Sequence, residues 1–329
     1  GHRLLLEGRG YEAIRLTVIG GFIALIISIV TVLFFGNYFT VLYNIIRPYI
    51  AYPLIAVIFF MILSEKQIKK IMYASLIILL SGFFGILVLN SSIVVPQNSL
   101  FPTFAGLFAI SSLITSITEK AKIPKQEIDT ELKTSKSNIT KAIALGVIAG
   151  VLVGLLPAVG VSQAATFMQY VGGLGEARTF LVTLASINTA NEVISLNSLY
   201  LISNPRSGAS VAIERILPDI SFNDVLLFLG VIFFVSGLVV PITLFLGRVI
   251  PKFLIKIDYN IMSFSVMGFL TLMIALITGV YGLLIGLTAT GIGLLCAYTG
   301  VRRTNCMGVL LLPSTLFFLG FNPLIFTLL

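Results

Sequence analysis

Runs of about twenty consecutive apolar residues recur along the whole chain, and each run is nearly free of charge. An α-helix of that length matches the roughly 30 Å hydrocarbon core of a bilayer. Only 10% of the residues are charged and 57% are hydrophobic, whereas a soluble domain carries about 25% charged residues. The runs are continuous and do not alternate, unlike the strands of a β-barrel. The sequence therefore predicts an all-α, multi-pass integral protein of the cell membrane.

The apolar runs predict about nine to eleven transmembrane helices, some of them broken or re-entrant. A polar segment, TEKAKIPKQEIDTELKTSKSNITK at Thr118–Lys141, divides them into two groups. We expect this segment to be a solvated linker, because charged side chains are costly in lipid. The expected full spans are Ala13–Phe35, Val41–Leu63, Ile71–Leu89, Phe101–Ile117, Ala142–Leu156, Arg178–Leu201, Val225–Leu246, Met262–Thr278, Tyr281–Tyr298 and Met307–Phe326.

The two groups of spans resemble each other, which predicts an internal duplication. Gly106 precedes LFAISSLI near the end of the first group, and Gly308 precedes VLLLPSTL near the end of the second. Internal repeats of this kind are typical of secondary transporters. We therefore expect a first repeat at residues 1–117, the polar linker at 118–141 and a second repeat at 142–329.

The net charge of +8 arises from basic clusters between the spans, which is the pattern of topology signals and not of nucleic-acid binding. In the first group the clusters occupy alternate loops. In the second group they occupy the loops that correspond to uncharged ones in the first. If all of them face the cytoplasm, the second repeat is inverted relative to the first. The clusters are Arg3/Arg9/Arg15, Lys66/Lys69/Lys70, the linker lysines, Arg248/Lys252/Lys256 and Arg302/Arg303.

The stretch GLLPAVGVSQAA, at 154–165, interrupts a predicted span. Pro157 removes a helical hydrogen bond, and Gly160 lets the backbone turn or approach a ligand. Ser162 and Gln163 then begin a new helix, whose free N–H groups could hold an anionic group. We expect a substrate-binding break at membrane depth. A simple proline kink, or a turn outside the membrane, is the alternative interpretation.

A second candidate is the polar stripe in NTANEVISLNS, at 188–198. Asn188, Asn191, Glu192, Ser195 and Ser198 recur at spacings of three and four, which places them on one helical face. A glutamate inside a span is costly and by default marks an ion or proton path. We expect Asn188 and Asn191 to bind substrate and Glu192 to couple an ion. The alternative is a stripe that holds helices together.

A third candidate is the polar segment SNPRSGAS, at 203–210. Arg206 offers a planar and permanent cation to a carboxylate or phosphate. Asn204 and Ser207 could complete the ring of hydrogen-bond donors around such a group. The alternative is an interfacial loop whose arginine is only a topology signal.

The remaining chemistry-bearing residues carry less weight. His2, Glu7 and Arg9 are candidates only because their segment occupies the place that residues 205–215 occupy in the second group, and an amphipathic surface segment is the alternative. Cys296 and Cys306 match no metal or redox spacing, so we expect them to be packing residues and expect no metal site.

Four stretches together resemble the large membrane subunit of tripartite tricarboxylate transporters, the TctA family, in its archaeal branch. They are GVLVGLLPAVGVSQAA at 150–165, GRGYEAI at 8–14, GLFAISSLI at 106–114 and RRTNCMGVLLLPSTL at 302–316. They occur in the family's order and cover nearly the whole chain.

The resemblance implies a permease with duplicated halves that imports carboxylates by means of an ion gradient. It also implies two partners, a small membrane subunit and an extracytoplasmic solute-binding protein. Ala158 departs from the family, which usually has the glycine of a Pro-Gly pair there. A first-half copy of the glycine-proline motif is expected upstream of Gly1, so we expect the chain to begin inside the first repeat.

The residues and the resemblance together predict a secondary active transporter for small anionic solutes, with carboxylates as the expected class. Arg206 would anchor the anion, and Glu192 would bind a sodium ion or a proton; no other cofactor is expected. A membrane protein that handles anionic lipid headgroups is the alternative function. An enzyme is not expected, because the spans contain no H-E-x-x-H, no aspartate pair and no serine–histidine pair.

Overall fold

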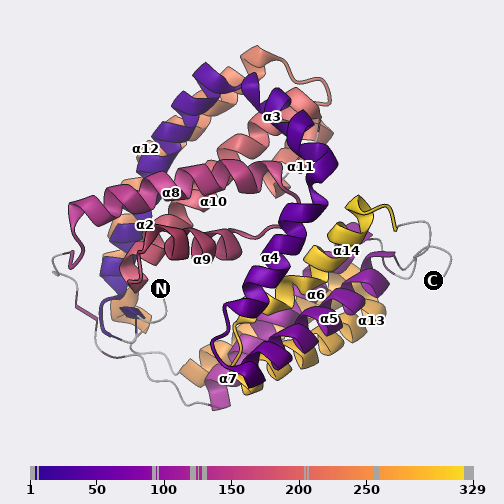
Figure 1. Cartoon of the computed structure of the whole chain (residues 1–329). Helices are drawn as coiled ribbons and strands as arrows, with labels where there is room; N and C mark the ends of the chain where they lie inside the picture. Colours follow the sequence, from indigo (N-terminus) through magenta and orange to yellow (C-terminus); the bar gives the residue numbers. More distant parts are fainter. Residues whose placement is uncertain are drawn as a thin grey trace. The chain divides into compact units, whose positions relative to one another are not determined.

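A computed structural model describes residues 4–5, 7–90, 94, 96–118, 124, 126–127, 132–203, 205, 207–254 and 259–321. Within these residues the secondary structure is helical, without strands, which confirms the all-α prediction (Figure 1). The helices before the linker are α2 (Gly10–Phe35), α3 (Tyr38–Ile46), the 3-10 helix η1 (Arg47–Tyr49), α4 (Ala51–Leu63), α5 (Ile68–Asn90), α6 (Pro96–Phe104), the π-helical η2 (Ala105–Ile110) and α7 (Ser111–Thr118). The later ones are α8 (Lys136–Leu155), α9 (Val161–Gly172), α10 (Ala177–Ile202), α11 (Gly208–Ile216), α12 (Phe222–Leu254), α13 (Tyr259–Thr299), η3 (Arg303–Met307) and α14 (Gly308–Phe318).

Six of the described helices are long and apolar enough to cross a membrane, or seven if α3 and α4 form one broken span. This is fewer than the nine to eleven expected, for identifiable reasons. The 41-residue α13 contains two of the predicted spans, separated at Gly279, whose φ of 65° breaks the helix. The predicted span Arg178–Leu201 does form α10, but its polar residues keep it outside the six.

The chain folds as two compact units that each combine early and late segments. Unit 1 comprises residues 1–48 and 123–256, and unit 2 comprises residues 49–122 and 257–329. Each unit therefore draws on both predicted repeats. The duplication and the inversion of the repeats stay predictions.

The core of unit 1 is a close contact of α8 with α10, which Figure 1 shows side by side. Three glycines of α8 at four-residue spacing face three residues of α10 at the same spacing, in the same order, so the two helices run parallel. The pairs are Gly146 with Ser186, Gly150 with Ala190, and Gly154 with Ile194. A Cβ at Gly150 would lie only 2.5 Å from Ala190 Cβ and 2.9 Å from the Ile187 carbonyl oxygen. Small residues let membrane helices approach in this way.

The other side of α10 packs on α2. A Cβ at Gly20 of α2 would lie 2.8 Å from the Val182 carbonyl oxygen, and the Ser186 hydroxyl donates to the Gly20 carbonyl oxygen over 3.1 Å. Helix α10 is thus held between α2 and α8 by backbone-close contacts. Its polar side chains are consequently fixed in position.

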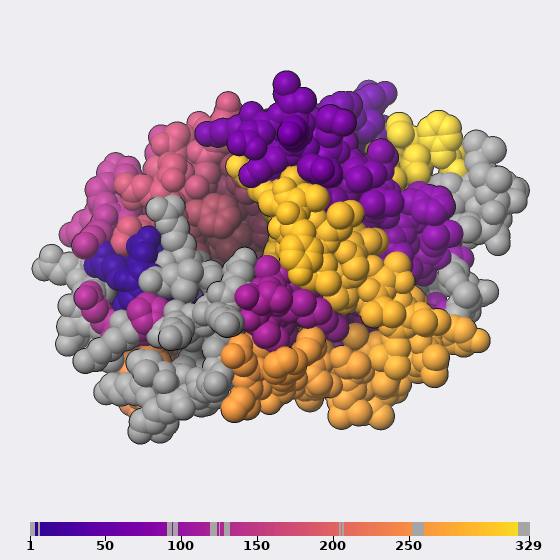
Figure 2. Space-filling model, turned by 90° about the horizontal axis from the view of Figure 1, so that it is seen from below, coloured from indigo at the N-terminus to yellow at the C-terminus, as the bar shows by residue number. Residues whose placement is uncertain are grey.

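Unit 2 packs α13 against α5, α6, η2 and α7, and α14 against α5. Figure 2 shows the magenta surface of the α6–α7 region beside the orange and yellow surface of α13. Cys296 and Cys306 are free, fully buried and part of this core, which confirms that they are packing residues. The buried Glu65 accepts a hydrogen bond from the Arg302 backbone N–H over 2.8 Å, and Arg302 Nη1 donates to Ser64 Oγ over 3.2 Å.

These contacts place basic clusters together at one end of each unit. In unit 2, Arg302 lies beside the segment that continues into Lys66. In unit 1, Arg248 Nε donates to the Tyr11 hydroxyl over 2.7 Å, and its guanidinium lies 5.4 Å from the centre of the Tyr11 ring. Such pairing is what a common cytoplasmic side for these clusters requires.

Candidate functional site

The polar residues of α10 do not all face the same neighbour: some face α8, and others face a cavity. At 100° per residue, Asn188, Glu192 and Ser195 fall within roughly 60° of one another, whereas Asn191 lies about 100° away from Glu192. Asn191 accordingly faces α8, where its Oδ1 would lie 3.6 Å from a Cβ at Gly154. Asn188 and Glu192 instead face a cavity on the opposite side of α10.

That cavity has a volume of about 380 Å³, which lies within the range of small-molecule sites. It is formed entirely inside unit 1, between α2, α10, α11 and α12. Most of its wall is apolar, and the polar groups lie mainly on α10 and at the start of α11, with Ser236 on α12. The lining residues are Leu25, Asn188, Thr189, Glu192, Val193, Leu196, Ser207, Ala209, Ser210, Ile213, Phe228, Val231, Ile232 and Ser236.

The start of α11 presents a group of hydroxyls and N–H donors to this cavity. Ser207 caps α11, because its Oγ accepts from the Ser210 N–H over 3.2 Å. The Ser210 hydroxyl lies 3.1 Å from the hydroxyls of both Ser207 and Ser195. This places Ser207 beside the polar face of α10. The positive end of the α11 dipole adds to the attraction for a negatively charged group.

Glu192 is the one acidic residue among the described residues that line the cavity, and they include no lysine or arginine. Its side chain is exposed to the cavity and has no hydrogen-bond or ion-pair partner in the described part of the chain. A carboxylate beside Asn188, in a mostly apolar wall, attracts a cation. The cavity thus combines a cation-attracting group on α10 with anion-attracting donors on α11.

The interruption predicted at residues 154–165 is present in the structure. Helix α8 ends at Leu155, Leu156 is extended with φ −95° and ψ 125°, and α9 starts after an extended Gly160. Ala158 adopts a φ of 63°, the left-handed conformation that favours glycine.

The start of α9 carries a buried amide without a partner. Gln163 is only 3% exposed, and among the described residues neither its Oε1 nor its Nε2 has a hydrogen-bond partner. No side chain caps α9, so the N–H groups of its first turn stay available. Ser162 is exposed, and Pro157 and Gly160 are half-buried.

The structure therefore brings some of the predicted site residues together and keeps others apart. Asn188, Glu192 and Ser207 line one cavity. Pro157, Gly160, Ser162 and Gln163 do not line it; they belong to the break between α8 and α9, and α9 packs against both α8 and α10. Asn204 and Arg206, together with His2, lie outside the described residues.

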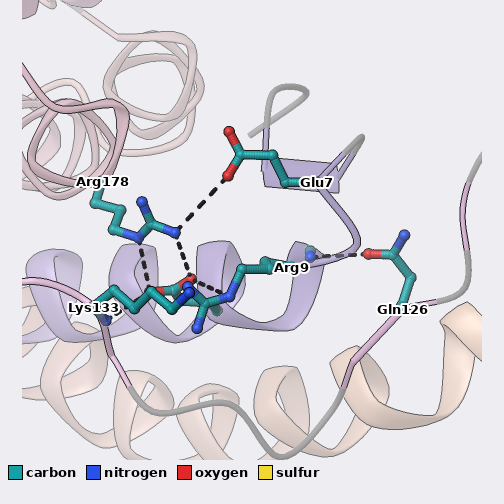
Figure 3. A network of polar contacts seen from close by, with 7 residues as sticks. Glu7, Arg9, Gln126, Lys133 and Arg178 are labelled. Atoms are coloured by element: carbon teal, nitrogen blue, oxygen red, sulfur yellow. Dashed lines mark hydrogen bonds and ion pairs between the residues drawn. The ribbon is translucent and has the colours of Figure 1, made fainter.

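A buried charge network in unit 1 was not predicted (Figure 3). Glu12 is completely buried; its carboxylate accepts from Arg178 Nε over 2.9 Å and lies 3.1 Å from Arg9 Nε. The Lys133 backbone N–H donates to the same carboxylate over 3.0 Å, and Arg178 Nη2 lies 3.9 Å from the half-exposed Glu7 carboxylate.

The segment before α2 and the first residue of this helix also bind the described part of the linker through hydrogen bonds. The Gln126 side chain accepts from the Gly10 N–H over 2.9 Å and donates to the Leu5 carbonyl oxygen over 3.0 Å. Sequence reasoning chose Glu7 and Arg9 in this segment by symmetry alone. A stronger signal was Glu12, a carboxylate inside an apolar helix, because such a group needs a partner.

A multi-span helical protein with a broken helix and a polar cavity inside one bundle belongs to the class of solute permeases. The chain belongs to the tripartite tricarboxylate transporter TctA family, whose family model matches residues 1–308. It is also similar to an uncharacterized protein of Methanocaldococcus jannaschii, with 31% identity over 97% of this chain and 79% of the relative. This similarity supports the archaeal branch of the family. No solved structure matches the chain.

Membership of this family makes the protein a transporter component and not an enzyme, and with its apolar helices it makes it a multi-pass membrane protein. A tripartite transporter also has further subunits and a solute-binding protein.

Proposed function

We propose that this protein is the permease of a secondary active transporter for small carboxylates, driven by a sodium or proton gradient. The observation that carries the proposal is the cavity of about 380 Å³ in which Asn188, Glu192 and Ser207 meet. Its volume suits a small organic acid. Its position between helices of one bundle is where transporters place their binding sites.

The cavity offers complementary groups for an anion and a cation. The hydroxyls of Ser207 and Ser210, with the first N–H groups of α11, would hold a substrate carboxylate. Arg206 directly precedes this cap in the sequence and would supply a permanent positive charge. Glu192, aided by Asn188, would hold the coupling sodium ion or proton. Binding of the cation would cancel the repulsion between Glu192 and the substrate, which links the two binding events.

The break between α8 and α9 would serve as a second polar contact for substrate. The N–H groups after Gly160, the Ser162 hydroxyl and the buried Gln163 amide are donors at the uncapped start of α9. Half-helix ends of this kind bind anionic groups in broken-helix transporters. The partners in the cell would be a small membrane subunit and an extracytoplasmic solute-binding protein.

The test is uptake of radiolabelled citrate and succinate into vesicles that contain the purified full chain, with its partner subunits where uptake needs them. A sodium gradient and a proton gradient are imposed separately. We expect uptake under one gradient, with loss of the gradient dependence in Glu192→Gln. Glu214→Gln on α11 is the matched control, because Glu214 does not line the cavity.

Ligand binding gives an independent measurement. We expect citrate to raise the thermal stability of the wild type in detergent, and we expect this effect to be lost in Arg206→Ala. The absence of stabilisation by any carboxylate, together with stabilisation by an anionic phospholipid, would contradict the proposal and support the handling of lipid headgroups.

A further inference from the structure

A second cavity of about 240 Å³ lies next to the first in unit 1. It follows the seam between α2 and α12, with Thr17, Val18, Gly21, Phe22, Leu25, Thr189, Val235, Ser236, Val239, Val240 and Thr243 in its wall. Leu25, Thr189 and Ser236 also line the first cavity. The two cavities therefore meet at these three residues, one helical turn from Glu192.

The second cavity extends from this junction toward the basic end of unit 1. Helices α2 and α12 run antiparallel, because the Phe22 ring stacks near Phe233 whereas Gly247 packs against Tyr11 and Ile14. The cavity thus covers on the order of 12 Å of the seam, from Leu25 to Thr17. Beyond it, the hydrogen bond between Arg248 and the buried Tyr11 closes the seam.

The wall of the second cavity differs from the lipid-facing side of α12. Ser236 and Thr243 lie two turns apart on its cavity side and line it together with Thr17 and Thr189. The opposite side exposes Phe234, Leu238 and Phe245. Hydroxyl groups at helical spacing can replace part of the hydration of a small cation or hold a chain of waters.

Charge decides which species suits this cavity. None of its lining residues is ionisable, so it offers no counter-charge to a carboxylate with two or three negative charges. Glu192 lies just beyond its inner end and attracts a positive species. The cavity is also smaller than the first one, which suits a hydrated ion better than an organic acid.

We propose that the second cavity is an aqueous route by which the coupling cation, a sodium ion or a proton, reaches Glu192 along the seam between α2 and α12. The inference rests on the proposed function, in which Glu192 binds that cation. It separates the cation route from the path of the anionic solute.

Water access along this seam can be measured by cysteine labelling in proteoliposomes, with the reagent supplied on both sides of the membrane. Thr243→Cys and Thr17→Cys probe the cavity, and Leu238→Cys is the control on the lipid-facing side of the same helix. The two native cysteines are buried, so the wild type serves as the blank. Charged methanethiosulfonates, one cationic and one anionic, are the probes, and each rate is divided by that reagent's rate with a free thiol.

We expect the cationic reagent to modify Thr243→Cys at least tenfold faster than Leu238→Cys, and at least tenfold faster than the anionic reagent modifies Thr243→Cys. Equal slow labelling of all three variants, with normal thermal stability, would overturn the route and indicate a lipid-filled groove. Equal rates with both reagents would overturn the assignment to cations. Uptake by the wild type is measured alongside: uptake that depends on no cation gradient refutes the proposed function, whereas coupled uptake with unreactive cysteines refutes only the route.

Discussion

Replacement of Gly150 by alanine is the most direct test of the close contact between α8 and α10. The new Cβ would lie 2.5 Å from Ala190 Cβ, 2.9 Å from the Ile187 carbonyl oxygen and 3.2 Å from the Asn191 backbone nitrogen. Two of these atoms belong to the backbone, so no side-chain rotation can relieve the contact. The helices must move apart, and overpacking of this kind costs about 1–3 kcal/mol.

The sign of the change in stability distinguishes overpacking at Gly150 from a general effect of replacing glycine by alanine. Gly237 lies inside α12 and has nothing within 4 Å of the place where a Cβ would stand. There Gly237→Ala should stabilise the helix by about 0.5–1 kcal/mol, because alanine has the better helix propensity. The same substitution is therefore expected to act in opposite directions at Gly150 and Gly237.

The unfolding midpoints of the two variants can be compared in detergent. Each sample is heated, and the protein that stays folded is quantified by size-exclusion chromatography. We expect a lower midpoint for Gly150→Ala and an unchanged or higher midpoint for Gly237→Ala. In the double variant Gly150→Ala/Ala190→Gly, where the methyl group has changed sides, we expect partial recovery. A Gly150→Ala protein as stable as the wild type would refute the close packing.

Two further predictions concern stability in unit 1. Ala158→Gly should stabilise the protein by about 0.5–1 kcal/mol, because glycine adopts the φ of 63° at residue 158 without strain; a lower unfolding midpoint in detergent would argue against that backbone conformation. Glu12→Gln should destabilise by about 3 kcal/mol, because it leaves Arg9 and Arg178 without their buried counter-charge. The Glu7 side chain is 42% exposed, so Glu7→Gln should lower the stability by less than about 1 kcal/mol in the same unfolding assay, and equal effects of Glu12→Gln and Glu7→Gln would contradict the network.

Local features of the fold could be predicted from the sequence. The break after Leu155 follows from Pro157 and Gly160, which act on the residues next to them. The helical periodicity likewise grouped Asn188 with Glu192. The predicted boundary between the two apolar runs of α13, near residue 280, matches the irregular Gly279.

Long-range features could not be predicted, because they depend on which helices become neighbours. Periodicity cannot show that Asn191 faces α8 whereas Glu192 faces α12, and it placed both in one site. Arg178 and Glu12 are separated by 166 residues, and no local pattern links them. The division of the chain into the two units could not be predicted for the same reason, because each unit joins segments that are distant in the sequence.

The wide separation of the charge partners has a consequence for biosynthesis. Arg178 follows Glu12 by 166 residues, and Lys133 follows it by 121. At about 5–20 residues per second, the ribosome needs roughly 10–30 s to deliver Arg178 after Glu12 has left it. During that interval Arg9, one helical turn away, is the only cation of the finished network already synthesised. Arg9 thus neutralises the Glu12 carboxylate of α2 until α10, which carries Arg178, has been synthesised.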